Sequence, residues 1–557
     1  NIDRNKLKVM DKVWSVDAVA KNQSTDVYGN ITTIAESKLD ENLLYAGTDD
    51  GLIQVTQDGG KTWTKIDNIP GVPDTTYVNE IVTSQHDRNT VYVTFNHHRY
   101  GDFHPYIYKS KDAGKTWTAI QNNLPEKGTA YCIAEDHVNP NLLFAGTEFG
   151  VYFSIDGGNK WVQLKSGLPT IAVRDMEIQK RENDLVLATF GRGFYVLDDY
   201  TPLRNLTKET LDKDAVIFPI KDAWMYIPSY PMGIRGKAFQ GESYFTTPNP
   251  KPAAVFTYYL KDDIKTIKDK RKEAEAEKIK NGQPPYYPPI DSLRMEDEET
   301  APHLLFTITD EQGNVIRRIK TSASKGMKRI TWDFRYAPFS PVSLSGGDES
   351  DPFSSNETGY MALPGNYKVF ISKYEDGAYT QLTEPQSFTC KALNAASLPA
   401  TDKTALENFS KKVGELRRVT AGTDEYKNEL YNKLTYINAA ILQTPGLSPD
   451  VAKTAESLKQ RLNKVNTLLN GNATLASREF ETKPSINGRV GNIVFALWST
   501  TAAPTQTMID SYNTAAKEFT PVYNEIKIIG DEIKNLENIL NKSNAPYTPG
   551  RLPEWKN

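Results

Sequence analysis

The residues best suited to chemistry gather in one short stretch, residues 95–105, where aromatic, basic and acidic side chains stand together. Phenylalanine and tyrosine rings can stack on sugars, while arginine and aspartate can hydrogen-bond hydroxyl or carboxylate groups. We interpret the stretch as an enlarged turn that recognises a ligand; the alternative is a self-packed Ω-loop that seals the surface beneath it. The candidate ligand-binding side chains here are His97, His98, Arg99, Tyr100 and Asp102.

Acidic residues in this and neighbouring turns raise a second possibility, the hydrolysis of a glycosidic bond. An inverting glycosidase holds two carboxyl groups about 6.5–9.5 Å apart, so that one protonates the leaving oxygen and the other activates water. The sequence does not pair them, and whether the protein is an enzyme stays open. The candidate catalytic carboxylates are Asp102, Asp175, Glu148 and Asp50, with Asp49 beside the last. Arg192 lies in a comparable turn, and Arg174, like Asp175, lies in a link between repeats that should reach the same face; both arginines join the ligand-binding candidates.

A pattern that occurs three times indicates the elements that position these turns. It consists of Ser or Thr, followed by Asp, Gly and Trp at fixed places. Gly permits positive φ in a tight turn, Asp accepts hydrogen bonds from the turn, and Trp buries a large apolar surface. Folding therefore accounts for every residue of the pattern, and we expect its Asp and Trp residues to be structural. They are Asp58 and Trp63, Asp112 and Trp117, and Asp156 and Trp161.

Each copy of the pattern belongs to a longer repeat of four short apolar strands. The strands of the first copy are expected at residues 31–35, 43–48, 52–55 and 61–66. The same order recurs twice, and a fourth copy around residues 176–197 ends in Asp198-Asp199 without the Gly and Trp. Successive copies lie roughly 40–55 residues apart, the length of one propeller blade. The turns between the second and third strands, which carry the candidate site, should open on the face opposite the Asp turns.

This repeat resembles the Asp-box, or BNR-repeat, β-propellers, which include the sortilin ectodomain and xyloglucanase-type glycoside hydrolases. The resemblance implies that the Asp turns lie on the rim away from the ligand. Propellers of these families have more blades than the four found here. We therefore expect residues 1–205 to be the C-terminal part of a larger propeller, with the missing blades supplied by an upstream segment or a second chain.

The rest of the chain falls into two further parts. Residues 206–395 contain alternating strands, and the runs 313–317, 330–333 and 363–367 resemble the Ig-like β-sandwich of flagellar hook-capping proteins. A charged segment at about 261–282 predicts a helical insertion, either a solvated arm or a docking arm. Residues 396–557 have helical periodicity and predict an α-helical bundle with a Pro-rich tail. The fold class is thus multidomain and mainly β.

Composition limits the function. A net charge of −4 gives no sign of a nucleic-acid partner, and no run of about 18 apolar residues could span a membrane. Two cysteines, Cys132 and Cys390, are expected to be buried free thiols, and no His or Cys spacing fits a metal, so neither metal nor cofactor is expected. The resemblance implies export, with the signal either removed or upstream of this sequence.

Together these features predict an exported, sortilin-like β-propeller that binds or scaffolds a glycan or a protein ligand. The alternative is a glycoside hydrolase of xyloglucanase or sialidase type, acting through paired carboxylates together with upstream blades. The ligand is not decided by the sequence.

Overall fold

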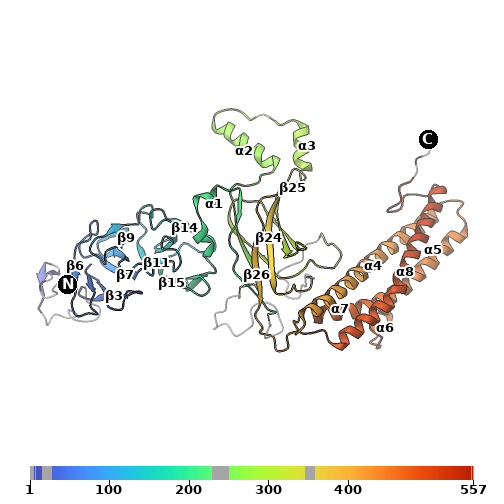
Figure 1. Ribbon diagram of the computed structural model, residues 1–557. Helices are drawn as coiled ribbons and strands as arrows, with labels where there is room; N and C mark the ends of the chain where they lie inside the picture. The colour runs from blue at the N-terminus through green and yellow to red at the C-terminus, as the bar shows by residue number, and fades with distance from the viewer. Residues whose placement is uncertain are drawn as a thin grey trace. The chain divides into compact units, whose positions relative to one another are not determined.

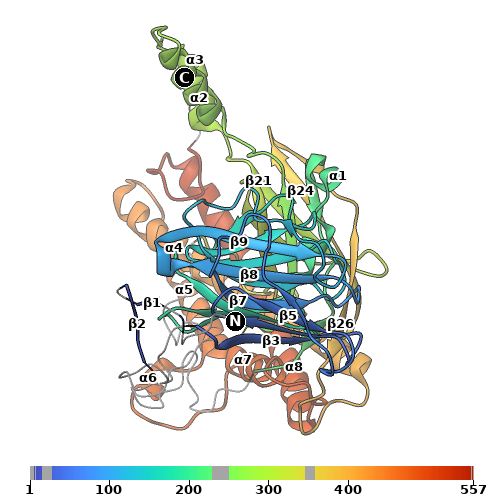
Figure 2. The same cartoon turned by 90° about the vertical axis from the view of Figure 1, so that its left-hand side faces the viewer.

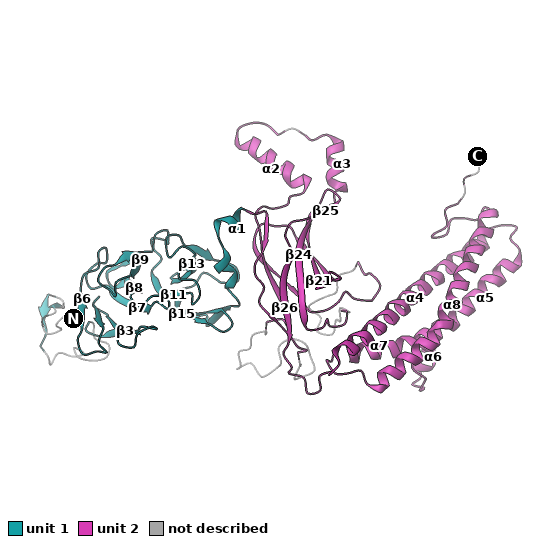
Figure 3. Ribbon diagram, viewed as in Figure 1, with its two compact units in different colours: residues 1–212 teal, residues 213–557 magenta. Residues whose placement is uncertain are grey.

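The computed structural model describes residues 6, 8–9, 11–15, 28–228, 250–285, 287–344, 358–553 and 555. The chain divides into two compact units, residues 1–212 and 213–557, which are coloured separately in Figure 3. As the sequence predicts, the fold has several antiparallel sheets followed by a C-terminal helical region, an arrangement consistent with a β-propeller-like multidomain protein. The boundaries proposed at residues 205 and 395 remain predictions.

Unit 1 contains four consecutive antiparallel sheets, preceded by a small hairpin of β1 (Lys8–Val9) and β2 (Lys12–Val13). Chain order equals spatial order within every sheet, as in propeller blades (Figure 1). The first sheet consists of β3 (Ile31–Glu36), β4 (Leu44–Thr48), β5 (Ile53–Thr56) and β6 (Thr64–Ile66). The second consists of β7 (Tyr77–Thr83), β8 (Val91–His97), β9 (Asp102–Ser110) and β10 (Thr118–Ala119). The third consists of β11 (Ala130–Glu135), β12 (Leu143–Thr147), β13 (Gly150–Ser154) and β14 (Val162–Leu164), and the fourth of β15 (Val173–Gln179), β16 (Asp184–Thr189) and β17 (Phe194–Leu197).

The four sheets pack face to face through apolar side chains, and Figure 2 shows strands of the first two sheets layered over one another. Tyr45 of β4 and Ile81 of β7 share one core, and Phe144 of β12 shares another with Met176 of β15. A glycine brings the first two sheets close: a Cβ at Gly47 would lie 2.5 Å from Cγ1 of Val78. The repeated Ala-Gly-Thr of the second strand is therefore a packing feature.

The three Asp turns join the third and fourth strands and have the same hydrogen bonds. In the second turn Asp112 accepts from Ser110 Oγ at 2.8 Å and from the Thr116 N–H at 2.8 Å. Asp58 and Asp156 accept the equivalent bonds in the other two turns. The tryptophans differ: Trp161 is buried, Trp117 is half-buried and Trp63 is exposed. The burial expected of all three depends on a neighbouring sheet, which Trp63 lacks among the described residues.

The fourth sheet has three strands instead of four. After β17 the chain enters a 3-10 turn, η2 (Thr201–Asn205), and then helix α1 (Lys208–Asp212). Buried Tyr200 packs against Phe144, with the ring centroids 5.1 Å apart, and its hydroxyl donates to Asp136 at 2.6 Å. Arg204 holds the same carboxylate through two hydrogen bonds. This polar cluster closes the sheet in the absence of the Gly and Trp of an Asp turn.

Unit 2 begins with two sheets that enclose one aromatic core. Phe256 lies 5.1 Å from Phe388 between ring centroids, and Tyr258 lies 5.0 Å from Phe306, each pair joining the two sheets. The arrangement is a β-sandwich; the Ig-like relationship remains a prediction. One sheet has β18 (Ala215–Ile217), β20 (Ala254–Leu260) and β23 (Gly326–Trp332). The other has β19 (Ala223–Met225), β26 (Gln386–Ala392), β24 (Gly365–Glu375), β21 (His303–Asp310) and β22 (Val315–Ser322), with β25 (Ala378–Gln381) paired to β24.

Helices complete unit 2. The charged insertion at about 261–282 forms α2 (Ile267–Lys280), which buries none of its described side chains, and a helix outside the predicted range, α3 (Ile290–Glu298), follows it. The C-terminal helices run side by side in Figure 1 around a leucine- and isoleucine-rich core. They are α4 (Lys403–Gln443), α5 (Pro449–Asn470), α6 (Ala473–Ala476), α7 (Ile486–Leu497) and α8 (Gln506–Lys542). No helix within the described ranges is long and apolar enough to cross a membrane. Cys132 and Cys390 are buried free thiols, as predicted.

Candidate functional site

The inner strands of the four sheets share an irregularity near their beginnings. The pairing of β3, β7, β11 and β15 with the next strand shifts register after the first residues, which leaves one residue of each inner strand bulged. The bulged residues are Thr32, Asn79, Tyr131 and Arg174. A bulge re-aims a side chain and leaves backbone groups without ladder partners, which is why bulges often border functional sites.

A pocket of about 360 Å³ opens at three of these bulges. It is lined by Tyr77, Asn79, Glu80, Tyr131, Arg174 and Asp175, all near the beginnings of β7, β11 and β15. In an antiparallel sheet the beginning of the first strand lies at the same end as the turn between the second and third strands. The pocket is therefore at the end of the sheets opposite the Asp turns, on the face where the sequence predicts a site.

Hydrogen bonds between sheets hold the floor of this pocket in place. The Asn79 amide donates to the Tyr131 carbonyl at 3.1 Å, and its oxygen accepts from Asn96 Nδ2 at 2.6 Å. Glu80 Oε2 accepts the Ile133 N–H at 2.8 Å. The same position in the first sheet, Thr33, accepts from the Ile81 N–H. Glu80 thus replaces a small hydroxyl in a repeated contact between neighbouring inner strands.

Glu80 has an unusual environment for a carboxyl group. Burial raises the pKa of Glu80 to about 8; the hydrogen bond from the Ile133 N–H opposes the rise, and the negative charges of Asp175 and Glu177 add to it. Near neutral pH the side chain is largely protonated and can donate a hydrogen bond. Asp175 accepts from the Met176 N–H at 2.8 Å and is exposed, so the pocket combines a neutral acid with an accessible carboxyl group.

Arg174 forms the opposite wall by stacking on aromatic rings. Its Cζ lies 3.8 Å from the centroid of the Tyr131 ring and 5.1 Å from that of Phe190. The Tyr131 hydroxyl donates to the Glu148 carboxylate; burial together with this hydrogen bond raises the pKa of Tyr131. Stacking fixes the plane of the guanidinium group while leaving the donors at its edge available for a ligand.

Side chains of the enlarged turn, residues 95–105, mainly contact one another and neighbouring residues of the chain. The His97 ring stacks on Tyr100 with centroids 4.4 Å apart, and His97 Nδ1 lies 2.9 Å from Thr76 Oγ1. The Tyr100 hydroxyl lies 2.5 Å from that of Tyr28. A short 3-10 turn, η1 (His98–Tyr100), provides this geometry. The contacts resemble those of a packed turn, and two of its side chains contact aromatic rings that line the pocket.

Those two side chains are Arg99 and His98. Arg99 Cζ lies 5.7 Å from the Tyr77 ring centroid, and Arg99 Nη2 lies 3.8 Å from Asp49 Oδ2. The His98 ring meets the Tyr131 ring edge-on at 5.9 Å. Burial lowers the pKa of His98. The enlarged turn therefore supports two pocket-lining rings from behind.

The predicted carboxylates do not form one group. Asp175 lines the pocket and Glu148 contacts its wall, whereas Asp102 is bonded within its own turn, to Tyr106 Oη at 2.6 Å and the His104 N–H at 2.9 Å. Asp49 and Asp50 are buried in the first sheet, where Asp50 accepts from Thr48 Oγ1 at 2.5 Å. Arg192 is exposed in the turn between β16 and β17 and does not line the pocket.

Sequence reasoning missed Asn79, Glu80 and Tyr131. Glu80 could have been found from the sequence, because it directly precedes the apolar residues Ile81 and Val82 in a predicted inner strand. An acidic side chain in a buried strand requires a hydrogen-bond partner or a shifted pKa. The bulges themselves have no sequence signature in this chain, since the four bulged residues are of four different types.

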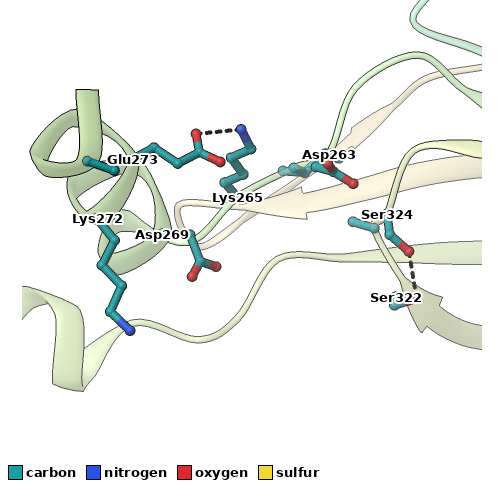
Figure 4. A pocket seen from close by; sticks show the side chains of 10 residues that line it. Asp263, Lys265, Asp269, Lys272, Glu273, Ser322 and Ser324 are labelled. Carbon is teal, nitrogen blue, oxygen red and sulfur yellow. Dashed lines mark hydrogen bonds and ion pairs between the residues drawn. The ribbon is translucent and has the colours of Figure 1, made fainter. Parts of the chain in front are cut away.

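A second cavity, of about 520 Å³, lies in unit 2 between α2 and the turn that joins β22 to β23 (Figure 4). Two of its charged side chains pair with each other, Lys265 Nζ lying 2.5 Å from Glu273 Oε2, and Asp263 accepts a hydrogen bond from the Lys325 backbone N–H. It is lined partly by the charged insertion at about 261–282, and none of the candidate ligand-binding or catalytic residues lines it. Among the described residues, no group of three or more His, Cys, Asp or Glu side chains is placed to hold a metal ion.

Comparisons with known proteins come from structure alone, because no family model and no curated protein matches the chain. YCF48 from Cyanidioschyzon merolae is 18% identical over 30% of this chain and 53% of its own, with a TM-score of 0.24. The GH74 xyloglucanase from Xanthomonas campestris is 12% identical over 28% of this chain and 26% of its own, with a TM-score of 0.23. An ancestral GH74 enzyme is 11% identical over 63% of this chain and 40% of its own, with a TM-score of 0.26. The chain spans about half or less of each protein, and what they bind or cleave is not carried over.

Proposed function

We propose that this chain is a propeller-type binding or scaffolding protein that holds a polar segment of a glycan or a protein in the pocket of the inner strands. We also propose that it is exported and that further blades, from an upstream segment or a second chain, complete its ring. The resemblance of the Asp-turn repeats to sortilin-like propellers supports both of these points.

One observation supports the binding role most strongly. Arg174 Cζ lies 3.8 Å from the Tyr131 ring centroid and 5.1 Å from that of Phe190, yet the guanidinium group has no hydrogen bond or ion pair with any residue that the structure describes. A fixed guanidinium with available donors recognises hydroxyl or carboxylate oxygens at little cost in side-chain entropy. Asp175 and protonated Glu80 add an acceptor and a donor beside it.

The test is a binding screen of the full chain against β-glucans, xyloglucan, sialylated glycans and a peptide library. Arg174→Ala should weaken binding by roughly 1–3 kcal/mol, the value of a hydrogen bond to a charged group. Arg181→Ala is the matched control, because Arg181 lies in the turn between β15 and β16, is exposed and pairs with Glu182 away from the pocket. Equal binding by the Arg174→Ala and Arg181→Ala variants would remove the pocket from the proposal.

Hydrolysis is the second candidate, favoured by the two carboxyl groups of the pocket. Glu80, protonated near neutral pH, has the property of a general acid, and Asp175 is an accessible carboxyl group in the same pocket. Glu80→Gln and Asp175→Asn keep the shape of each side chain but remove its proton chemistry. Reducing ends released from these glycans by the native chain, and lost in both variants, would make the protein a glycoside hydrolase. Binding without release supports the binding role.

A further inference from the structure

The inner strands present an apolar side chain at the same register position in all four sheets, and its exposure differs sharply in one of them. Ile34 is 70% exposed, whereas Ile81, Ile133 and Met176 at the equivalent positions are 4%, 1% and 5% exposed. The residue before the bulge follows the same rule: Ile31 is exposed, and Val78, Ala130 and Val173 are fully buried.

The preceding sheet is what covers this position elsewhere. Ile81 shares a core with Tyr45 and Val55 of the first sheet, and Ile133 with Tyr92 and Ile107 of the second. Met176 likewise packs with Phe144 and other residues of the third sheet. In each case a side chain from the inner strand of one sheet enters an apolar face of the sheet before it.

The Asp turns follow the same arrangement. A Cβ on Gly158 would lie 2.9 Å from Cβ of Ile120 in the second sheet, and one on Gly114 would lie 2.9 Å from Cδ1 of Ile66 in the first. Gly60, in the first turn, has only its own Trp63 within 4 Å. Trp63 is accordingly 46% exposed, whereas Trp161 is 3% exposed. We call the surface formed by Ile31, Ile34 and Trp63 the open face.

We infer that the open face docks a further four-stranded propeller blade from a polypeptide stretch outside residues 28–205. This blade would present aromatic and aliphatic side chains at the positions of Tyr45, Ile53 and Val55, which cover the equivalent face of the second sheet. The inference rests on the part of the proposed function that expects further blades, and it uses a surface separate from the ligand pocket.

A second copy of the chain is a poorer occupant. Its fourth sheet would have to supply the covering face, and Phe194 and Val196 of that sheet match the apolar character of Ile53 and Val55 at the equivalent positions. The mismatch lies in the inner strand of the fourth sheet. It carries Glu177 where the other sheets have Ala35, Val82 and Ala134. Docking would bury this carboxylate against apolar side chains without a cationic partner, which is unfavourable.

The experiment adds a blade to the full chain. A second copy of residues 30–76 is inserted between Gly29 and Asn30, with Trp63→Phe in the inserted copy, so that its Tyr45 and Val55 can cover the original Ile34. Hydroxyl-radical oxidation of the original Trp63, read by mass spectrometry, should fall in the extended chain to the rate of half-buried Trp117, which the first sheet covers. Oxidation at the rate of the native chain would overturn the inference.

Two controls make the result specific. Ile34→Asp in the original copy should restore Trp63 oxidation in the extended chain, while in the native chain it should leave the melting temperature unchanged because the side chain is exposed. Ile133→Asp, at the buried equivalent, should unfold the sheet. Sedimentation should show the native chain as a monomer; a dimer that Ile34→Asp dissociates would assign the open face to a second copy and overturn the choice of occupant. These readouts do not involve ligand, so they fail or succeed independently of the binding screen.

Discussion

At the scale of single residues, each Asp turn is held closed by its own aspartate. Hydrogen bonds from Thr62 and from Thr116 lower the pKa values of Asp58 and Asp112 to about 2, so both carboxylates remain charged and bonded above strongly acidic pH. These bonds are local in sequence, which is why residue types and spacing were enough to predict a structural role. Tryptophan burial is set by a neighbouring sheet and could not be predicted from the turn alone.

The difference among the tryptophans gives a stability prediction. Trp161 is buried and its Nε1 donates to the Ile120 carbonyl at 2.7 Å, so Trp161→Ala should lower the free energy of unfolding by about 3–5 kcal/mol. Trp63→Ala is the matched control and should cost less than about 1 kcal/mol, because Trp63 is exposed. Urea denaturation of the full chain measures both. Equal losses would mean that the open face is covered in solution.

Glu80 gives a prediction about pH. Because burial raises its pKa to about 8, from 4.5, the folded chain binds this proton more tightly than the unfolded chain does. The resulting stabilisation is complete below about pH 4.5 and is lost as the pH rises toward 8, by at most about 1.4 kcal/mol per pH unit. Glu80→Gln keeps an acceptor for the Ile133 N–H and removes the titration. The free energy of unfolding, measured by urea denaturation, should therefore fall more steeply between pH 5 and 8 in the native chain than in Glu80→Gln; parallel curves would contradict the assignment.

At the scale of elements, the enlarged turn and the bulged inner strands jointly shape the pocket. The turn braces Tyr77 and Tyr131 through Arg99 and His98, and the bulges re-aim Asn79 and Arg174. The strands could be predicted from apolar runs and turn residues, since these are local signals in the sequence. The bulges could not be predicted in this way, because they arise from the pairing of two strands. The fourth copy of the repeat lacks the Gly and Trp of an Asp turn, and the corresponding sheet lacks a fourth strand.

The enlarged turn can be tested as an element. Replacing Arg99 and Tyr100 together by alanine should weaken ligand binding by about 1–3 kcal/mol, because the support of the pocket rings is lost. Tyr100→Phe is the milder control: it keeps a ring against His97 but loses the hydroxyl contacts to Tyr28 and to Thr75 Oγ1. Titration of each variant with the ligand found in the screen measures the change. Binding that is indifferent to the double replacement would leave the turn with a purely structural role, as an Ω-loop.

At the scale of the whole molecule, the two units have different relations to the sequence. Helical periodicity predicted the C-terminal helical region, and in the structure the side chains of Asp402 and Ser448 cap the beginnings of α4 and α5. The junction of helices and sandwich in unit 2 depends on Arg335, which donates to the Trp498 carbonyl at 3.0 Å, a contact between residues far apart in the chain. The candidate site is of the same kind, since three separate inner strands supply it.

We expect ligand to be held at the beginnings of the inner strands, on the side away from the Asp turns. Hydrogen–deuterium exchange of the full chain, with and without the glycan or peptide found in the screen, tests this most directly. Bound ligand should slow the exchange of backbone amides in residues 77–80, 131–133 and 173–176. Protection confined to the Asp turns, residues 56–63, 110–117 and 154–161, with no change in the inner strands, would contradict it.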